Sequence, residues 1–279
     1  MELWEKQHID TLLPSFIVMI VLGFILRMWL RKKSEKIRMI PLQICTIFLL
    51  AIEVIKQIKS FEGGEYDLYS LPLHFCSLFL YMLPLMCFYN GKNKDKVRAI
   101  TTMICGSLFV LMTIYPGLIY GGGNIDNFFN GLRDFRASGD IKDLFNNFLD
   151  FHTVAFHTVA TFTFVIIIAL DLHKPNYARD AKACLIFIIC YCAIAGIAAQ
   201  VLQTNYNNFY NCNVPPLQAV KEMLEPILGY GITQALYVVI VSIVDIIFTQ
   251  LVYFIYRILR SPLKHTEDVR DEYDMYLEY

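Results

Sequence analysis

Charged side chains are scarce in this sequence. Asp, Glu, Lys and Arg make up 18% of its 279 residues, whereas hydrophobic residues make up 56%. Together with a mean hydropathy of +0.47, this scarcity excludes an ordinary soluble domain, in which about a quarter of the residues are charged. We therefore expect an all-α protein that crosses a membrane several times, with membrane lipids and no nucleic acid among its partners.

Three further patterns are missing, namely a cleavable signal sequence, a disulfide scaffold, and metal-binding or repeat motifs. The basic residues follow the first apolar run, and no small-residue cleavage site appears, so we expect this run to remain as a membrane helix. Seven of the eight cysteines lie in apolar segments, with only Cys212 in an expected loop, which argues against a disulfide scaffold. The sequence also contains no HExxH or CxxC motif and no strong internal repeat.

Long apolar runs are abundant, and seven of them can each supply the roughly 20 residues that cross a bilayer. The expected spans are Thr11 to Leu30, Ile37 to Ile58, Leu71 to Tyr89, Val97 to Tyr120, Phe151 to Leu172, Ala181 to Gln203 and Ile227 to Tyr256. The sequence thus predicts a seven-helix transmembrane domain over residues 1–260, followed by an acidic tail at 261–279.

Lys and Arg gather on alternate sides of these spans. Basic clusters lie at residues 27–38, 92–98, 174–182 and 257–264, whereas the other three loops are poorer in Lys and Arg for their length. By the positive-inside rule, the basic loops and the tail are cytoplasmic and the N-terminus is outside.

Polar side chains cluster at the opposite, outer level of the expected spans. They are Glu53, His74, Cys76, His152, His157, Asn205 and Tyr206. Ionisable groups inside a membrane are costly, so each is a candidate functional residue until a structural partner is found. The orientation of the spans rests on Lys and Arg alone. The shared depth of these other residues in the membrane is therefore an independent indication of a site.

Cys76 and the histidines suggest acyl chemistry. Ser70 is a plausible N-cap and Pro72 fits a first helical turn, which would place His74 and Cys76 in the first two turns of the third span. The positive end of that helix would then favour the thiolate of Cys76. Helix geometry does not put neighbouring candidates on one face, so contacts between helices must complete a site with a thiol and a base.

Other interpretations remain open. Cys76 can be a small packed residue, Glu53 can simply pair with Lys56 or orient a histidine, and we expect Asp245 to hydrogen-bond between helices. A zinc-dependent hydrolase could use His74, His152 and His157 together with Cys76, Asp150 or Glu53, although we predict no metal or other cofactor. A non-enzymatic transporter or sensor that binds a lipid or solute is the third possibility.

Four short motifs resemble a known family. They are LPLHFC at residues 71–76, IYP at 114–116, HTVAFH at 152–157 and TNY at 204–206. Their order and spacing resemble the YwaF-like family of bacterial integral membrane proteins, which is distantly similar to a eukaryotic transmembrane phospholipid acyltransferase. The resemblance implies a multi-pass protein of the bacterial cytoplasmic membrane that acts on an acyl-chain-bearing substrate, with no obligate protein partner evident.

The resemblance also implies roles for individual residues. Cys76 would be the nucleophile of an outer-leaflet acyltransferase or lipid-ester hydrolase, and His157 or else His152 would be the base. From the residues themselves, we expect His74 to orient the thiol, Glu53 to set a histidine's tautomer and Asn205 to donate to the oxyanion. Glu53, Asn205 and Tyr206 are assigned to substrate binding or orientation.

Overall fold

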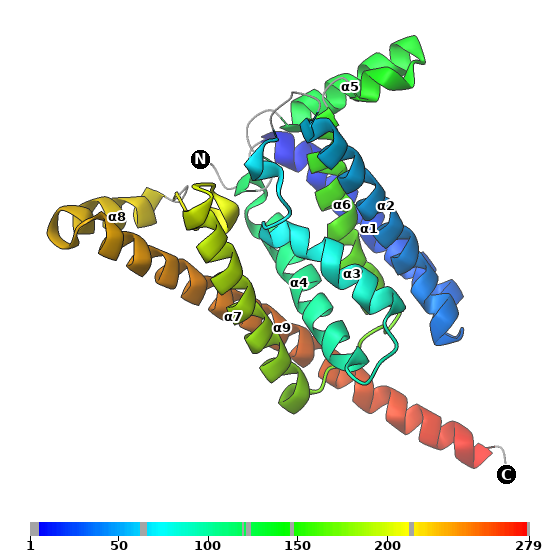
Figure 1. The fold of residues 1–279 in the computed structure, drawn as a ribbon. Helices are drawn as coiled ribbons and strands as arrows, with labels where there is room; N and C mark the ends of the chain where they lie inside the picture. The colour runs from blue at the N-terminus through cyan, green and yellow to red at the C-terminus, as the bar shows by residue number, and fades with distance from the viewer. Residues whose placement is uncertain are drawn as a thin grey trace.

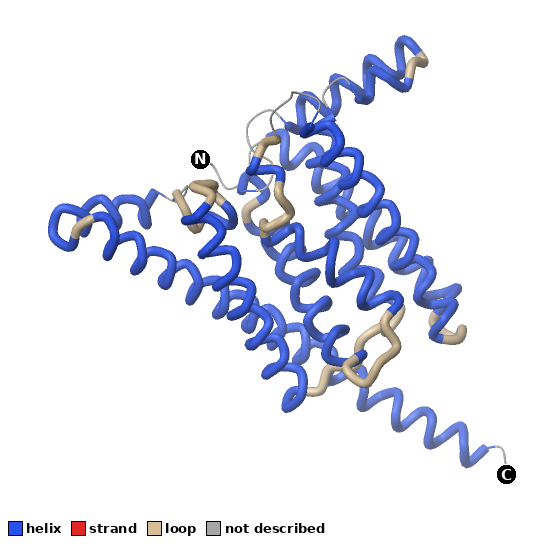
Figure 2. Tube along the Cα trace, viewed as in Figure 1, coloured by secondary structure: helices blue, strands red, loops and turns tan. Residues whose placement is uncertain are grey.

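The computed structural model describes residues 6–61, 66–118, 120, 124–145, 148–211 and 215–277. Within these residues every regular element is a helix and no strand is present (Figure 2). The all-α fold expected from the sequence is therefore confirmed.

Nine α-helices follow one another along the described residues (Figure 1). They are α1 (Lys6–Leu30), α2 (Glu35–Phe61), α3 (Leu78–Phe88), α4 (Lys94–Ile114), α5 (Asn124–Ser138), α6 (Phe148–Ala169), α7 (Tyr177–Val201), α8 (Pro215–Leu228) and α9 (Tyr230–Leu277). Short 3₁₀ helices lie between them, at η1 (Leu68–Ser70), η2 (Phe75–Ser77), η3 (Pro116–Leu118), η4 (Ile141–Phe145) and η5 (Tyr206–Asn208).

Helix α4 lies at the centre of the bundle. It packs against α3, α6, α7 and α9, while α6 also packs against α1 and α2. More than half of the most apolar part of α4 is buried, whereas α1 leaves most of its apolar side chains exposed. Such exposure is expected where lipid rather than protein covers a helix, so α1 is peripheral and α4 is the core helix.

Six helices are long and apolar enough to cross a membrane. The described residues add one shorter apolar helical stretch, Phe75–Phe88, in the place of the expected third span. At about 1.5 Å per residue, the 11 residues of α3 extend only about 16 Å, roughly half of a hydrocarbon core. The expectation of a full-length third helix from Leu71 to Tyr89 is therefore wrong.

Pro72 explains this difference. A proline disfavours helical geometry in the residue before it, and Leu71 has the extended angles φ −59° and ψ 137°. Ser70 ends η1 instead of capping an α-helix, and His74 is again extended, with φ −71° and ψ 157°. The same rule ends α4 early, because Pro116 follows Tyr115 and the helix stops at Ile114 instead of reaching Tyr120.

The bundle has two polar ends. The Cys76 end comprises the C-terminal part of α2, the segment 66–77, the N-terminal part of α6 and η5. The Asp171 end comprises the α1–α2 turn, the N-terminal part of α4 and the α6–α7 loop at residues 170–176. The candidate residues from the sequence lie at the first, and the predicted cytoplasmic basic residues lie at the second.

Candidate functional site

A buried contact between a carboxylate and a histidine ring joins α2 to α6 at the Cys76 end. The Nε2 atom of His152 lies 3.0 Å from Oε2 of Glu53, and both side chains are buried. The other carboxylate oxygen of Glu53 lies 2.9 Å from Nζ of Lys56 and accepts a hydrogen bond of 2.7 Å from Gln57. Glu53 thus pairs with Lys56 and also contacts a histidine, so both roles considered for it from the sequence are present together.

Gln57 connects this pair to the segment that carries Cys76. Its Nε2 also donates to the carbonyl oxygen of Ser70 at 2.7 Å, and its Oε1 accepts from the hydroxyl of Tyr66 at 2.5 Å. The position of η1 is therefore tied to the side chains of α2. Because helix α2 holds Glu53 one turn before Gln57, the two polar groups are fixed together.

His74 lies between two tyrosines. Its ring centroid is 4.5 Å from that of Tyr69 and 5.4 Å from that of Tyr206, both edge to face. Its Nε2 lies 3.1 Å from the carbonyl oxygen of Tyr69. Since a carbonyl oxygen only accepts, Nε2 carries the proton, and Nδ1 keeps the lone pair in the neutral ring.

Tyr206 anchors this arrangement from η5. Its hydroxyl donates to the carbonyl oxygen of Leu68 at 2.5 Å, and its side chain is fully buried. The neighbouring Asn205 uses its own side-chain oxygen to accept from the backbone N–H groups of Tyr210 and Asn211, at 3.2 and 3.0 Å. Asn205 therefore organises its own loop, and Tyr206 positions the segment of η1 and His74.

Cys76 lies in η2, two residues before α3 begins. The prediction that it occupies the first two turns of an α-helix is wrong. The positive end of such a helix therefore no longer supports a thiolate at Cys76. Its side chain is packed against the core, and it lies close enough to Lys56 and Glu53 for their charges to act on it. The hydrogen bonds of the His74, His152 and His157 rings go to groups other than Cys76.

His157 is held by its own helix. Its Nδ1 lies 2.7 Å from the carbonyl oxygen of Thr153, so Nδ1 is the protonated nitrogen and Nε2 keeps a lone pair. Its ring packs edge to face against Tyr120, with centroids 6.1 Å apart. Lys56, His152 and His74 lie close enough to interact electrostatically with this ring, which places His157 in the same polar region.

The ligands proposed for zinc are not assembled. The part of the chain that the structure describes contains no group of three or more His, Cys, Asp or Glu side chains able to hold a metal ion. His152 faces Glu53, while Asp150 accepts from the side-chain amide of Asn127 at 2.8 Å. The zinc alternative therefore receives no geometric support from these side chains.

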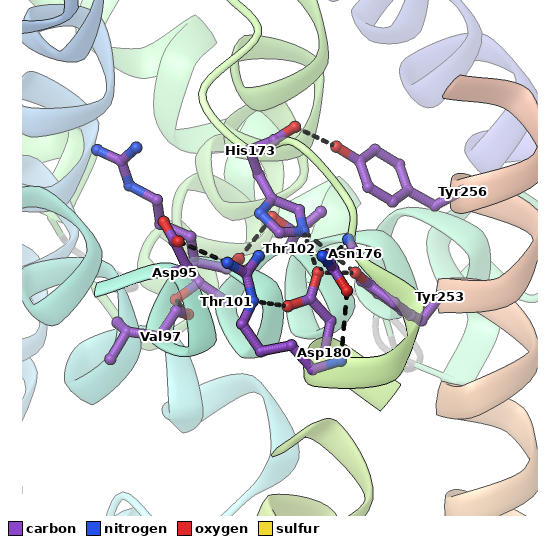
Figure 3. A network of polar contacts seen from close by, with 11 residues as sticks. Asp95, Val97, Thr101, Thr102, His173, Asn176, Asp180, Tyr253 and Tyr256 are labelled. Atoms are coloured by element: carbon purple, nitrogen blue, oxygen red, sulfur yellow. Dashed lines mark hydrogen bonds and ion pairs between the residues drawn. The ribbon is translucent and has the colours of Figure 1, made fainter. Parts of the chain in front are cut away.

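A second polar network, at the Asp171 end, escaped the sequence interpretation. Asp180 accepts from Tyr253 at 2.7 Å, from the backbone N–H of Asn176 at 2.6 Å and from Nε of Arg179 at 2.6 Å (Figure 3). Arg179 also reaches Asp95 on α4 at 2.5 Å. Asn176 was recognisable as an N-cap with an acidic first turn after it, but nothing nearby in the sequence indicates the partner on α9.

His173 completes this network in the α6–α7 loop. Its Nε2 lies 3.2 Å from the Tyr253 hydroxyl, and its carbonyl oxygen accepts from Tyr256 at 3.0 Å. Burial lowers the pKa of His173 to about 4, although the nearby carboxylate of Asp180 opposes the change. The ring is therefore neutral near pH 7, and the hydrogen bonds of the network hold α4, α7 and α9 together.

Asp245 has the interhelical role expected for it. It accepts a hydrogen bond of 2.6 Å from the side chain of Asn207, which joins η5 to α9. Similarly, Gln200 donates to the carbonyl oxygen of Phe209 at 2.9 Å. These bonds hold the loop that follows α7, in which Asn207 and Asn208 have positive φ angles of 49° and 60°.

The comparisons with known proteins identify the family. No curated protein and no solved structure matches the chain. The model of the TMEM164 family matches residues 3–256, nearly the whole sequence. This match does not by itself assign the chain to the YwaF-like bacterial proteins that its motifs resemble. With six helices able to cross a membrane, the chain is a multi-pass membrane protein that belongs to the TMEM164 family.

Proposed function

We propose that this protein is an intramembrane acyltransferase or lipid-ester hydrolase that uses Cys76 as its nucleophile. The observation that carries the proposal is that Cys76 lies within reach of the charges of Lys56 and Glu53, and that Glu53 in turn contacts His152. The resemblance of the LPLHFC segment to the YwaF-like family, which implies that Cys76 is the nucleophile, supports the same residue.

The chemistry divides into two steps. The Cys76 thiolate attacks the carbonyl carbon of a lipid ester, and the tetrahedral intermediate collapses to a thioester as the lysolipid oxygen leaves. A histidine takes the thiol proton and returns it to that oxygen. Attack on the thioester by an acceptor hydroxyl then gives acyl transfer, and attack by water gives hydrolysis.

His157 is the base in this proposal. Its bond to Thr153 leaves Nε2 unprotonated and able to accept a proton. His152, the alternative, directs Nε2 toward Glu53, and the pair resembles a carboxylate that fixes a histidine's tautomer. His74 acts as a positioning residue, because its ring and backbone hold the segment that carries Cys76 against Tyr69 and Tyr206.

A groove between α1 and α6 offers a place for an acyl chain. It encloses about 330 Å³ and is lined by apolar side chains that include Val18, Met19 and Leu22 on α1 and Val159 and Phe162 on α6. Thr158, also in the groove, lies 3.1 Å from the hydroxyl of Tyr120, which packs on His157. A lipid chain in this groove would thus lie beside the helix that supplies the base.

The proposal includes the predicted orientation. Counting the segment 66–77 together with the short α3 as one crossing gives seven crossings, which put the N-terminus outside and the Cys76 end at the outer leaflet. The tail at residues 261–279 is then cytoplasmic. The backbone of residues 261–277 continues α9 as a helix, which extends the C-terminal span away from the bundle (Figure 1).

Mass spectrometry of the purified protein tests this function. The wild type, Cys76→Ala and His157→Ala proteins are incubated with a phospholipid mixture and examined for an acyl adduct and for released lysolipid. We expect the adduct on Cys76 of the wild type, none in Cys76→Ala, and slower formation in His157→Ala. Cys190→Ala is the matched control, because Cys190 is exposed on α7 and has no proposed role.

Two results would overturn the proposal. One is an unmodified Cys76 in a folded wild-type protein across the whole lipid mixture. The other is lysolipid release by Cys76→Ala at the wild-type rate, which would place the chemistry on another residue. Thermal unfolding of each variant shows whether the fold is intact and separates these results from misfolding.

A further inference from the structure

Tyr191 on α7 holds the segment 66–77, which carries Cys76. Its hydroxyl donates to the carbonyl oxygen of Leu73 at 3.2 Å, and its ring packs edge to face against that of Phe75, with centroids 6.1 Å apart. Leu73 and Phe75 precede Cys76 by three residues and by one. These contacts place the buried Tyr191 side chain beside the proposed nucleophile. The phenol lies close enough to Cys76 to interact with it electrostatically.

The bond from Tyr191 to Leu73 is weaker than the corresponding bond of the second tyrosine that holds this segment. Tyr206 donates to the carbonyl oxygen of Leu68 at 2.5 Å. Hydrogen bonds from a hydroxyl to an oxygen are most often about 2.7–2.8 Å long and seldom exceed about 3.0 Å. At 3.2 Å the Tyr191 hydroxyl is restrained only weakly, so it can turn to a better acceptor at little cost in free energy.

Such an acceptor arises in the proposed reaction. When the Cys76 thiolate attacks an ester, an electron pair of sulfur forms the bond to carbon and the carbonyl π pair moves onto oxygen. The resulting oxyanion needs donors that are already in place, because each donor is worth far more in a site without water than in solution. Asn205, which the sequence suggests for this role, directs its side-chain oxygen to two N–H groups of its own loop and its Nδ2 to Asn208.

We propose that the Tyr191 hydroxyl donates the hydrogen bond that stabilises this oxyanion. This role rests on the proposed function, to which it adds a residue that touches the reacting atoms. As the oxyanion forms, the O–H group turns from Leu73 to the negative oxygen, a stronger acceptor than a neutral carbonyl. The oxyanion then returns its electron pair to carbon, the bond to the lysolipid oxygen breaks, and His157 returns the proton to that oxygen. The Tyr191 hydroxyl keeps its own proton throughout and turns back to Leu73.

Two reactions of Cys76 separate this role from a structural one. Acylation by p-nitrophenyl octanoate passes through an oxyanion, whereas alkylation by iodoacetamide displaces iodide directly and forms none. Both are followed in the detergent-purified protein by mass spectrometry of the peptide that contains Cys76. For Tyr191→Phe we expect acylation to be about 10- to 100-fold slower than in the wild type, with the alkylation rate unchanged.

Tyr81→Phe is the matched control. It removes a hydroxyl that donates to the carbonyl oxygen of Pro72, in the same segment, at 3.3 Å from an exposed position on α3. We expect both reactions of this variant to match those of the wild type. The ring of Tyr191→Phe keeps its contact with Phe75, and thermal unfolding of each variant confirms that the bundle is intact.

Two results would overturn the role of Tyr191 alone. One is acylation of Tyr191→Phe at the wild-type rate. The other is an equal fall in acylation and alkylation, which would show that the hydroxyl only positions the segment. A folded wild-type protein that is alkylated at Cys76 but acylated neither by p-nitrophenyl octanoate nor by phospholipid would overturn the proposed function, and the role of Tyr191 with it.

Discussion

His152 Nε2 lies 3.0 Å from Glu53 Oε2, across the contact between α2 and α6. The two residues are 99 positions apart in the sequence, and both are buried. Lys56 contacts the same carboxylate from the next turn of α2. The three side chains satisfy one another, so removal of the central carboxylate leaves two polar groups without their partner.

Glu53→Ala is therefore expected to destabilise the bundle strongly. Loss of one member of a buried pair costs about 3 kcal/mol, because the remaining groups lose their compensation. Glu53→Gln retains a hydrogen-bond acceptor and is expected to cost about 1 kcal/mol. Thermal unfolding in detergent measures the difference, with Val54→Ala, at a position exposed on α2, as the control. Equal unfolding temperatures for Glu53→Ala and Val54→Ala would contradict this account.

Tyr206→Phe should loosen the segment that carries Cys76. The substitution removes only the hydroxyl that donates to Leu68, while the ring keeps its contact with His74. We expect a small loss of stability, about 1 kcal/mol, and faster alkylation of Cys76 by a maleimide, quantified by peptide mass spectrometry. Tyr230→Phe changes an exposed tyrosine and serves as the control. An unchanged alkylation rate would show that this hydrogen bond does not restrain η2.

Gly23 allows α1 to approach α6 closely. A Cβ atom added there would lie 2.6 Å from Cγ1 of Val165, well inside van der Waals contact. Gly23→Ala is expected to destabilise the protein by about 1–3 kcal/mol, despite the better helix propensity of alanine. The double variant Gly23→Ala with Val165→Ala should recover most of the loss. Gly231→Ala, where no atom lies within 4 Å of the added Cβ, is the control.

If the double variant is as unstable as Gly23→Ala, the close approach is not what limits this position. A loss of similar size in Gly231→Ala would point to the same conclusion. Thermal unfolding of these proteins and of the single variant Val165→Ala, all in one detergent, gives the comparison. The coupling between Gly23 and Val165 is the quantity that decides it.

Hydrophobic runs were sufficient to predict the six long membrane helices, because each long run must satisfy its backbone hydrogen bonds within itself. The sequence also predicts that Glu53 and His152 lie at a similar depth in the membrane, because successive spans run in opposite directions. It does not predict their direct contact, because the rotation of each helix and the choice of its neighbours depend on packing over the whole bundle. The irregular segment before α3 contradicts the predicted third span. Pro72 indicates a break in the helix, but the apolar character of residues 71–77 is equally typical of a continuous membrane helix.

The network around Asp180 shows a different limit of prediction from the sequence. A carboxylate in the first turn of a helix is ordinarily read as a favourable partner of the helix N-terminus. Its partner Tyr253 lies on α9, and Asp95, which Arg179 bridges to it, lies on α4; no local pattern connects either residue to Asp180. The contact between Asp171 and Arg260 has the same character, since the two residues are 89 positions apart in the sequence.

His173 makes the stability of the protein depend on pH. Burial lowers the pKa of this ring to about 4, against an ordinary value of about 6.5 for an unfolded chain. The folded state therefore binds its proton less readily than the unfolded state does. The stabilising effect is fully present above pH 6.5 and is lost as the pH falls toward 4, at up to about 1.4 kcal/mol per pH unit. His173→Gln, which cannot titrate, should lose less stability over the same range. Because other titrating groups are common to both proteins, the difference between their unfolding temperatures at pH 7, 6 and 5 isolates this ring. If the difference between the two unfolding temperatures stays constant with pH, His173 titrates alike in the folded and unfolded states. The hydrogen bond to Tyr253 would then not depend on a neutral imidazole.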